Sequence, residues 1–120
     1  MGIDPRSTEK AFHGQVVELA HAKGWHQLYL YHSDALASGV PDLCLLKVSD
    51  DSIRLLFAEL KRERGGRLSR KQRFWLDSLS KVPGAEVYLW RPSHWAEIVE
   101  VLTITAPTAF TSTWRANELD

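Results

Sequence analysis

The most informative segment of the sequence is Leu55-Leu56-Phe57-Ala58-Glu59-Leu60-Lys61. Its composition predicts a buried β-strand that carries two charged residues near its end. Side chains alternate between the two faces of a strand, so Glu59 and Lys61 share one face with Phe57, and the other face is wholly apolar. Burying two charges is costly unless something pairs with them. The stretch therefore predicts a polar site at the edge of a hydrophobic core.

A second acid, Asp42, follows Pro41 and opens the preceding apolar run. Two neighbouring strands that each carry a carboxylate can hold a metal ion between them, and Mg²⁺ or Mn²⁺ prefers oxygen ligands of this kind. In this hypothesis Asp42 and Glu59 supply the carboxylates, and the backbone carbonyl of Leu60 adds another oxygen. Lys61 points the same way as Glu59 and can stabilise an anionic transition state.

Length and composition indicate one globular domain. The 120 residues are 44% hydrophobic and 25% charged, which allows a sizeable core. The one cysteine, Cys44, excludes disulfide stapling and favours a reducing compartment, so we expect the cytoplasm. We expect no membrane association, because no apolar run approaches the length of a membrane span and no signal peptide is visible.

A net charge of zero conceals a strongly basic segment. Residues 61–73 hold seven basic residues and one acid, a net charge of +6, so the rest of the chain carries −6. A basic band beside an acidic pair suits an enzyme that acts on a polyanion, and a solvated loop and helix face is the alternative. The candidate nucleic-acid-binding residues of this basic band are Arg62, Arg64, Arg67, Arg70, Lys71 and Arg73.

The periodicity predicts an α/β fold with an α+β mixed sheet and the element order α-β-β-β-α-β-α. The polar turn 49–52 joins the second and third strands as an antiparallel hairpin, and the strand after the second helix runs parallel to the third. Ser69 and Gln72 match a capping box at the start of the second helix. The expected elements are a helix at 8–23, strands within 25–32, at 42–48 and at 53–61, a helix at 69–82, a strand at 86–90 and a helix at 93–102.

Five motifs follow one another along most of the chain. They are Glu9 in the opening helix, Gly39-x-Pro41-Asp42-Leu43, Phe57-Ala58-Glu59-Leu60-Lys61, Leu68-Ser69-x-x-Gln72 and Trp90-Arg91-Pro92. In this combination and order they resemble the VRR-NUC branch of the PD-(D/E)XK nuclease superfamily. The resemblance implies a restriction-endonuclease-like core and a metal-dependent phosphodiesterase that acts on DNA.

The resemblance also implies a role for each matching residue. Asp42 and Glu59 become metal ligands, with Glu9 an added acid near the metal. Lys61 becomes the catalytic lysine, and Gln72 contributes at the edge of the site while also serving its helix cap.

Stand-alone members of this branch resemble Holliday-junction resolvases, whose homodimers cut branched DNA. We therefore expect a structure-selective endonuclease of DNA repair, in a bacterial or phage-infected cell, with residues 9–102 as the nuclease domain between a flexible segment 1–8 and a tail 103–120. Three alternatives remain: a flap or duplex nuclease, a non-cleaving nucleic-acid-binding module with the same fold, and a protein-interaction domain with ordinary ion pairs.

The remaining aromatic residues and histidines have less specific interpretations. Trp95, Phe110 and Trp114 are candidate anchors of a homodimer interface, unless the tail folds back over its own sheet. No histidine has a zinc-type spacing with cysteine or acid. His13 and His32 are within reach of the site, and partly buried structural roles are the better interpretation for both.

Overall fold

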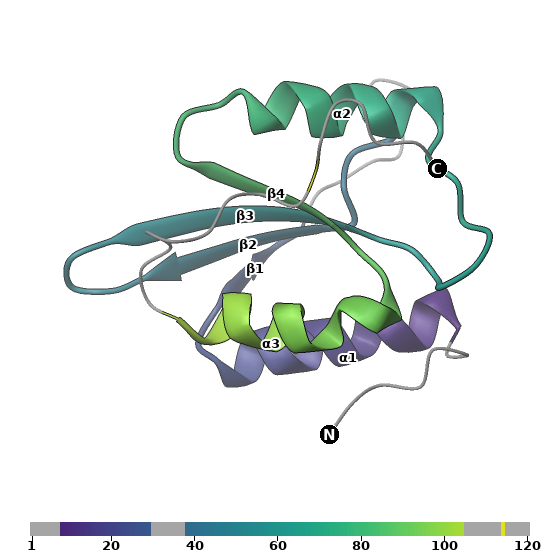
Figure 1. Ribbon diagram of the computed structural model, residues 1–120. Coiled ribbons are helices and arrows are strands. Elements are labelled where there is room, and N and C mark those ends of the chain that lie inside the picture. The colour runs from purple at the N-terminus through teal and green to yellow at the C-terminus, as the bar shows by residue number, and fades with distance from the viewer. Residues whose placement is uncertain (1–7, 30–37, 105–113, 115–120) are drawn as a thin grey trace.

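The computed structural model describes residues 8–29, 38–104 and 114. Its elements in chain order are α1 (Glu9–Ala22), β1 (His26–Leu28), β2 (Leu43–Val48), β3 (Ile53–Leu60), α2 (Arg70–Ser80), β4 (Ala85–Trp90), the 3₁₀ helix η2 (Pro92–His94) and α3 (Trp95–Thr103). They form three layers, with the sheet between α2 on one face and α1 with α3 on the other (Figure 1). The α+β fold and its mixed sheet are confirmed, and both are compatible with a restriction-endonuclease-like core.

The sheet has the strand order β1-β2-β3-β4. Both β1 and β3 pair antiparallel with β2, whereas β4 pairs parallel with β3. The predicted hairpin and the predicted parallel fourth strand are therefore both present. Leu43 lies opposite Ala58 in the ladder, and this register brings the residue before β2, Asp42, to the end of β3.

Two apolar cores hold the layers together. The larger core lies under α1 and α3, and the smaller one lies under α2. Leu56, Ala58 and Leu60 face the larger core as the alternation predicted, while Glu59 lies on the α2 face of the same strand. The larger core contains Phe12, Val16, Ala20, Trp25, Leu43, Leu45, Leu56, Ala58, Leu60, Tyr88, Trp90, Ile98, Val101 and Leu102. None of the helices in the described ranges has the length and apolar character that crossing a bilayer requires.

The first strand differs from the prediction. Residues 28–31 were expected at its centre, yet β1 covers only His26–Leu28, and Tyr29 lies outside it with 85% of its surface exposed. Leu28 pairs with Cys44, the second residue of β2. Only Leu43 therefore remains in β2 to pair with the residues that follow Leu28. The rest of the expected strand, 30–32 with His32, lies outside the described residues, as do segment 1–7 and Phe110.

Trp114 returns to the body of its own chain. Its side chain is 3% exposed and completes the smaller core, with Leu76, Val87 and Leu89. The indole Nε1 donates a hydrogen bond to Asp77 Oδ1 at 2.8 Å. Trp95 is partly buried against the larger core. Neither tryptophan is therefore presented to a partner in the way that the interface hypothesis required.

Candidate active site

Asp42 and Glu59 meet where β2 begins and β3 ends. Asp42 Oδ2 accepts a hydrogen bond from the backbone N–H of Leu60 at 2.9 Å, which fixes the exposed carboxylate against the neighbouring strand. Glu59 is 2% exposed and lies on the same side of the sheet as α2. The structure thus brings together the two carboxylates and the Leu60 backbone, which the sequence analysis named as candidate metal ligands.

The two oxygens of Glu59 differ in their surroundings. Oε2 accepts a hydrogen bond from Gln72 Nε2 at 3.0 Å and lies 3.8 Å from Lys61 Nζ. Oε1 is buried and has no hydrogen-bond partner among the described residues. An unsatisfied buried acceptor costs about 1–3 kcal/mol and is rare in folded proteins, so this oxygen is placed as a ligand atom would be.

The same surroundings shift the acidity of Glu59. The pKa of its carboxyl is raised from 4.5 to about 8, first by burial and then by the charge and hydrogen-bonding side chain of the neighbouring Asp42. The Lys61 ammonium opposes the shift, and the Glu9 charge makes a smaller upward contribution. A carboxyl held this far from its ordinary pKa favours either a proton or a cation beside it.

Gln72 both caps α2 and contacts Glu59. Its side-chain Oε1 accepts from the Ser69 backbone N–H at 2.8 Å, and Ser69 Oγ accepts from the Gln72 N–H at 3.1 Å. This capping box begins α2. The amide nitrogen of the same side chain remains available to donate to Glu59, so the helix cap also orients the buried carboxylate.

Gly39 allows the loop before Asp42 to pass against the first turn of α2. Its φ is +88°, and a Cβ there would lie 2.7 Å from Lys71 Cβ and 2.9 Å from the Gln72 nitrogen. Trp75 Nε1 donates to the Ser38 carbonyl at 3.1 Å and ties the same loop to the helix. The Gly-x-Pro-Asp motif therefore has a steric reason: only glycine fits both the backbone angle and the close approach.

Glu9 approaches the site from the start of α1. Glu9 and Asp42 line a pocket of about 470 Å³, together with Lys10, His13 and Gly14. Sequence reasoning assigned His13 a structural role and passed over Lys10. The position of His13, four residues after Glu9 on a helix, was a signal that could have placed it beside Glu9, whereas the spacing gave no such signal for Lys10.

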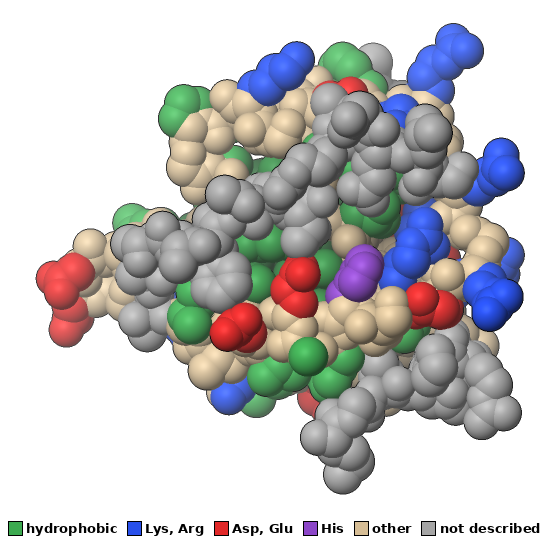
Figure 2. Space-filling view, in the orientation of Figure 1, with side chains coloured by type: hydrophobic (Ala, Val, Ile, Leu, Met, Phe, Trp, Pro, Cys, Tyr) green, Lys and Arg blue, Asp and Glu red, His purple; other side chains and the backbone are tan. Residues whose placement is uncertain are grey.

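The basic band divides into two groups. Arg64, Arg67, Arg70 and Lys71 are exposed, and Lys and Arg side chains gather at the end of the molecule where α2 begins (Figure 2). The other two residues contact the protein itself, although Arg62 is also exposed and only Arg73 is half-buried. Arg62 Nε donates to the Arg64 carbonyl at 2.8 Å, and the Arg73 guanidinium lies 5.6 Å from the Trp114 ring centroid.

The loop that carries this band is held to the segment after β4. Arg91 Nη1 donates to the Arg62 carbonyl at 2.7 Å, and the Ser93 N–H donates to Glu63 Oε1 at 2.8 Å. The one acid of the band is thus occupied within the protein. The exposed arginines are presented from a braced loop, which reduces the entropy cost of binding an anion.

The donor set fits a hard divalent cation. No group of three or more His, Cys, Asp or Glu side chains in the described ranges is arranged to hold a metal by itself. Asp42, Glu59 and the Leu60 carbonyl are instead the small oxygen set that Mg²⁺ uses when waters and substrate phosphates complete its shell. The unpartnered Oε1 of Glu59 gives this set a ligand atom that the protein leaves unused.

One family model matches the chain. The VRR-NUC domain model covers residues 5–93, which is most of the sequence. No curated protein and no solved structure gives a significant match. The matched range contains every candidate metal ligand and the whole basic band, whereas α3 and Trp114 lie beyond it.

Proposed function

The chain belongs to the VRR-NUC family, and from this premise we propose that it is a divalent-metal-dependent endonuclease that cuts branched DNA. Family membership indicates a nuclease of the PD-(D/E)XK type, and this superfamily generally uses divalent metals. The proposal rests on Glu59, whose buried Oε1 has no hydrogen-bond partner among the described residues and whose carboxyl interacts electrostatically with that of Asp42.

Asp42, Glu59 and the Leu60 carbonyl would hold Mg²⁺ or Mn²⁺, with Glu9 close by. When bound, the cation supplies Lewis acidity that offsets charge on the phosphate and makes water more acidic. Hydrogen bonds within the protein orient the two proposed carboxylate ligands before any cation binds. The Leu60 N–H holds Asp42 in place, and the amide of Gln72 holds one oxygen of Glu59 so that the other is directed away from it.

Lys61 is the cationic group of the proposed site. Its ammonium is 3.8 Å from Glu59 Oε2 and the residue is only 7% exposed, so solvent screens its charge weakly. A fixed positive charge in such a place stabilises the negative charge that grows on a phosphate during hydrolysis, and it can orient the attacking water.

The exposed part of the basic band would position the substrate. Arg64, Arg67, Arg70 and Lys71 are exposed on the connection from the end of β3, where Glu59 lies, to the first turn of α2, so they could contact phosphates near the scissile bond. Contacts of this kind supply affinity without reading sequence. They suit an enzyme that recognises the shape of its DNA.

We further propose that the enzyme acts as a homodimer within the cytoplasm of a bacterial or phage-infected cell, with residues 9–102 as its nuclease domain. Each chain offers one candidate site in its described residues, and a four-way junction has two strands to cut at symmetric positions. A two-fold dimer supplies two sites. The interface would lie away from Trp95 and Trp114, since both pack within their own chain.

The proposal is tested by incubating the protein with end-labelled four-way junction, flap and duplex DNA in Mg²⁺, Mn²⁺ or EDTA. We expect cleavage in either metal, preference for the junction, paired cuts and no product in EDTA. Sedimentation equilibrium should give about twice the monomer mass for the free protein at micromolar concentration, and two chains for each junction in the complex. Equal cleavage in EDTA would refute the metal requirement, and a monomer on the junction would favour a flap or duplex nuclease.

A further inference from the structure

The outer face of α2 is cationic with an aromatic ring at its centre. Phe74 is 63% exposed there, although its ring is large and apolar. Arg70 and Lys71 precede it by four and three residues, and Lys81 follows by seven, so all three share its face of the helix. Asp77, the one acid of α2, follows Phe74 by three residues, and its Oδ1 accepts a hydrogen bond from the Trp114 indole.

The ring of Phe74 is supported from one side. Its centroid is 5.9 Å from that of Trp75, with an angle of 79° between the two ring planes. The Trp75 indole is itself anchored, because it donates to the Ser38 carbonyl. An edge-to-face contact with an anchored neighbour limits the positions that the exposed ring can take. Phe74 is therefore partly preorganised while still open to solvent.

The three cations of this face outnumber its one acid, Asp77, within the described residues. No ion pair involving Arg70, Lys71 or Lys81 forms there. Cations of this kind contact phosphates, whereas a phenyl ring offers a surface on which a nucleobase can stack. Bases in an intact duplex already stack on one another, so only unpaired bases can use the ring.

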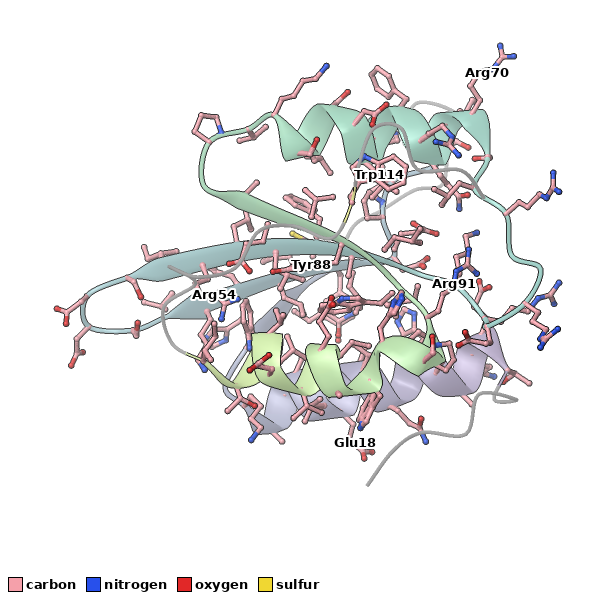
Figure 3. The ribbon with its side chains drawn as sticks, viewed as in Figure 1. Glu18, Arg54, Arg70, Tyr88, Arg91 and Trp114 are labelled. Atoms are coloured by element: carbon pink, nitrogen blue, oxygen red, sulfur yellow. The ribbon has the colours of Figure 1, made fainter. Side chains whose placement is uncertain are left out.

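The face is also continuous with the proposed site. Gln72, in the first turn of α2, reaches Glu59 on the inner side, while Arg70 and Lys71 begin the outer face in the same turn. Figure 3 shows Arg70 pointing away from the sheet at this end of the helix. A strand that leaves the carboxylates can therefore pass the two cations and reach Phe74 one helical turn later.

We infer that the outer face of α2, with Phe74 at its centre, binds unpaired nucleotides of the DNA substrate. The inference rests on the proposed function and adds to its substrate class branched DNA that carries a single-stranded segment or unpaired bases at the branch. Arg70, Lys71 and Lys81 hold the phosphates of that strand, and one of its bases stacks on Phe74.

The experiment measures binding in EDTA, so that cleavage has no part in the result. Fluorescence anisotropy of the full-length protein compares a single-stranded oligonucleotide, a perfect duplex and a duplex with a single-stranded flap. We expect Phe74→Ala to weaken binding of the first and third DNAs about tenfold and of the duplex less than about twofold. Phe74→Tyr keeps the ring and should retain wild-type affinity, as should the control Ile53→Ala, which removes an exposed apolar side chain on the hairpin.

The possible results distinguish the inferred single-strand binding from the proposed nuclease function. Equal loss on all three DNAs, or no loss on any, overturns the inference. A change in sedimentation mass with Phe74→Ala also overturns it, since the face would then serve self-association. If Phe74→Ala selectively weakens single-stranded binding but the wild-type protein never cuts in Mg²⁺ or Mn²⁺, the proposed function fails and the binding inference stands. A protein that binds no DNA refutes both.

Discussion

Glu59 combines several features that are each unfavourable in a folded protein. It is a carboxylate inside a sheet, close to another carboxylate, with one oxygen that no described residue satisfies. Replacing it by a leucine would suit the core better in physical terms. Strained polar groups of this type persist where they serve a site, and Glu59 is the clearest such case in the described residues.

The metal-free protein should lose stability as the pH rises through the titration of Glu59. Its pKa in the folded chain, about 8, lies above the ordinary 4.5, so the protonated form favours folding. This contribution is complete below pH 4.5 and is lost as the pH approaches 8. Urea unfolding in EDTA across pH 5–8.5 should show wild type declining relative to Glu59→Gln, which does not titrate. Parallel stability curves for the two proteins would contradict the assignment.

Gly39 should be far less tolerant of alanine than another glycine with the same backbone angle. Gly84 has a φ of +86° and no atom within 4 Å of a built Cβ, so Gly84→Ala should cost only about 1–2 kcal/mol of stability. Gly39→Ala adds the overlap with Lys71 and must displace the start of α2. We expect a larger loss in urea unfolding, together with at least about tenfold slower cleavage, because Gln72 moves away from Glu59. Equal stability costs for the two variants would refute the close approach.

At the scale of elements, a buried ion pair ties α3 to the sheet. Arg54, 1% exposed, donates to both oxygens of Glu86 at 2.8 and 2.6 Å. Its Nη1 also donates to the carbonyls of Val101 and Ile104, near the end of α3. Tyr88 completes the network by donating to Glu86 Oε1 at 2.9 Å. Figure 3 shows Arg54 and Tyr88 on the side of the sheet that α3 covers.

Removing only one partner of the Arg54–Glu86 ion pair should lower the stability of the protein. Arg54→Met leaves Glu86 buried and unpaired, and we expect a loss of about 3–5 kcal/mol in urea unfolding. The double variant with Glu86→Leu removes both charges and should recover most of that loss, although the Tyr88 hydroxyl then lacks its acceptor. A double variant no more stable than Arg54→Met alone would show that the ion pair is not the source of the cost.

Features with a local signal were predictable from the sequence. The alternation around Glu59 and the polar turn at 49–52 were enough to place two strands and the acidic pair, and the capping box placed the start of α2. Features that depend on distant contacts were not. Arg54 alternates correctly for an inward position, yet its partner is 32 residues away. Trp114 reaches Asp77 across 37 residues, and no local pattern encodes that return.

At the scale of the whole molecule, the basic side chains are concentrated at one end (Figure 2). Lys and Arg side chains gather where α2 begins, whereas Asp50 and Asp51 are exposed in the turn at the opposite end of the β2–β3 hairpin (Figure 2). A polyanion approaching this molecule is therefore drawn to the end that holds Glu59. The overall charge of zero gives no sign of this polarity.

Reversing charges in the basic band should weaken DNA binding broadly. Replacing both Arg64 and Arg67 by glutamate should lower affinity for duplex and junction alike, and the slope of log affinity against log salt should fall by about 0.9 for each phosphate that is no longer neutralised. Lys23→Glu, at the far end of α1 from the band, is the matched control. Anisotropy titrations at several salt concentrations measure both quantities. An unchanged slope would show that Arg64 and Arg67 do not contact phosphates, and it would favour the alternative of an ordinary solvated surface.

In the proposed function, Asp42 and Glu59 form the metal site of a nuclease. Single-turnover cleavage of a labelled junction in Mg²⁺ tests it most directly, with Asp42→Asn, Glu59→Gln and the exposed α1 control Glu18→Gln. Because a metal ion contributes several kcal/mol to the transition state, both site variants should slow cleavage at least about a hundredfold while binding DNA normally. Glu18→Gln should match wild type. A Glu59→Gln protein that cuts at the wild-type rate would contradict the account.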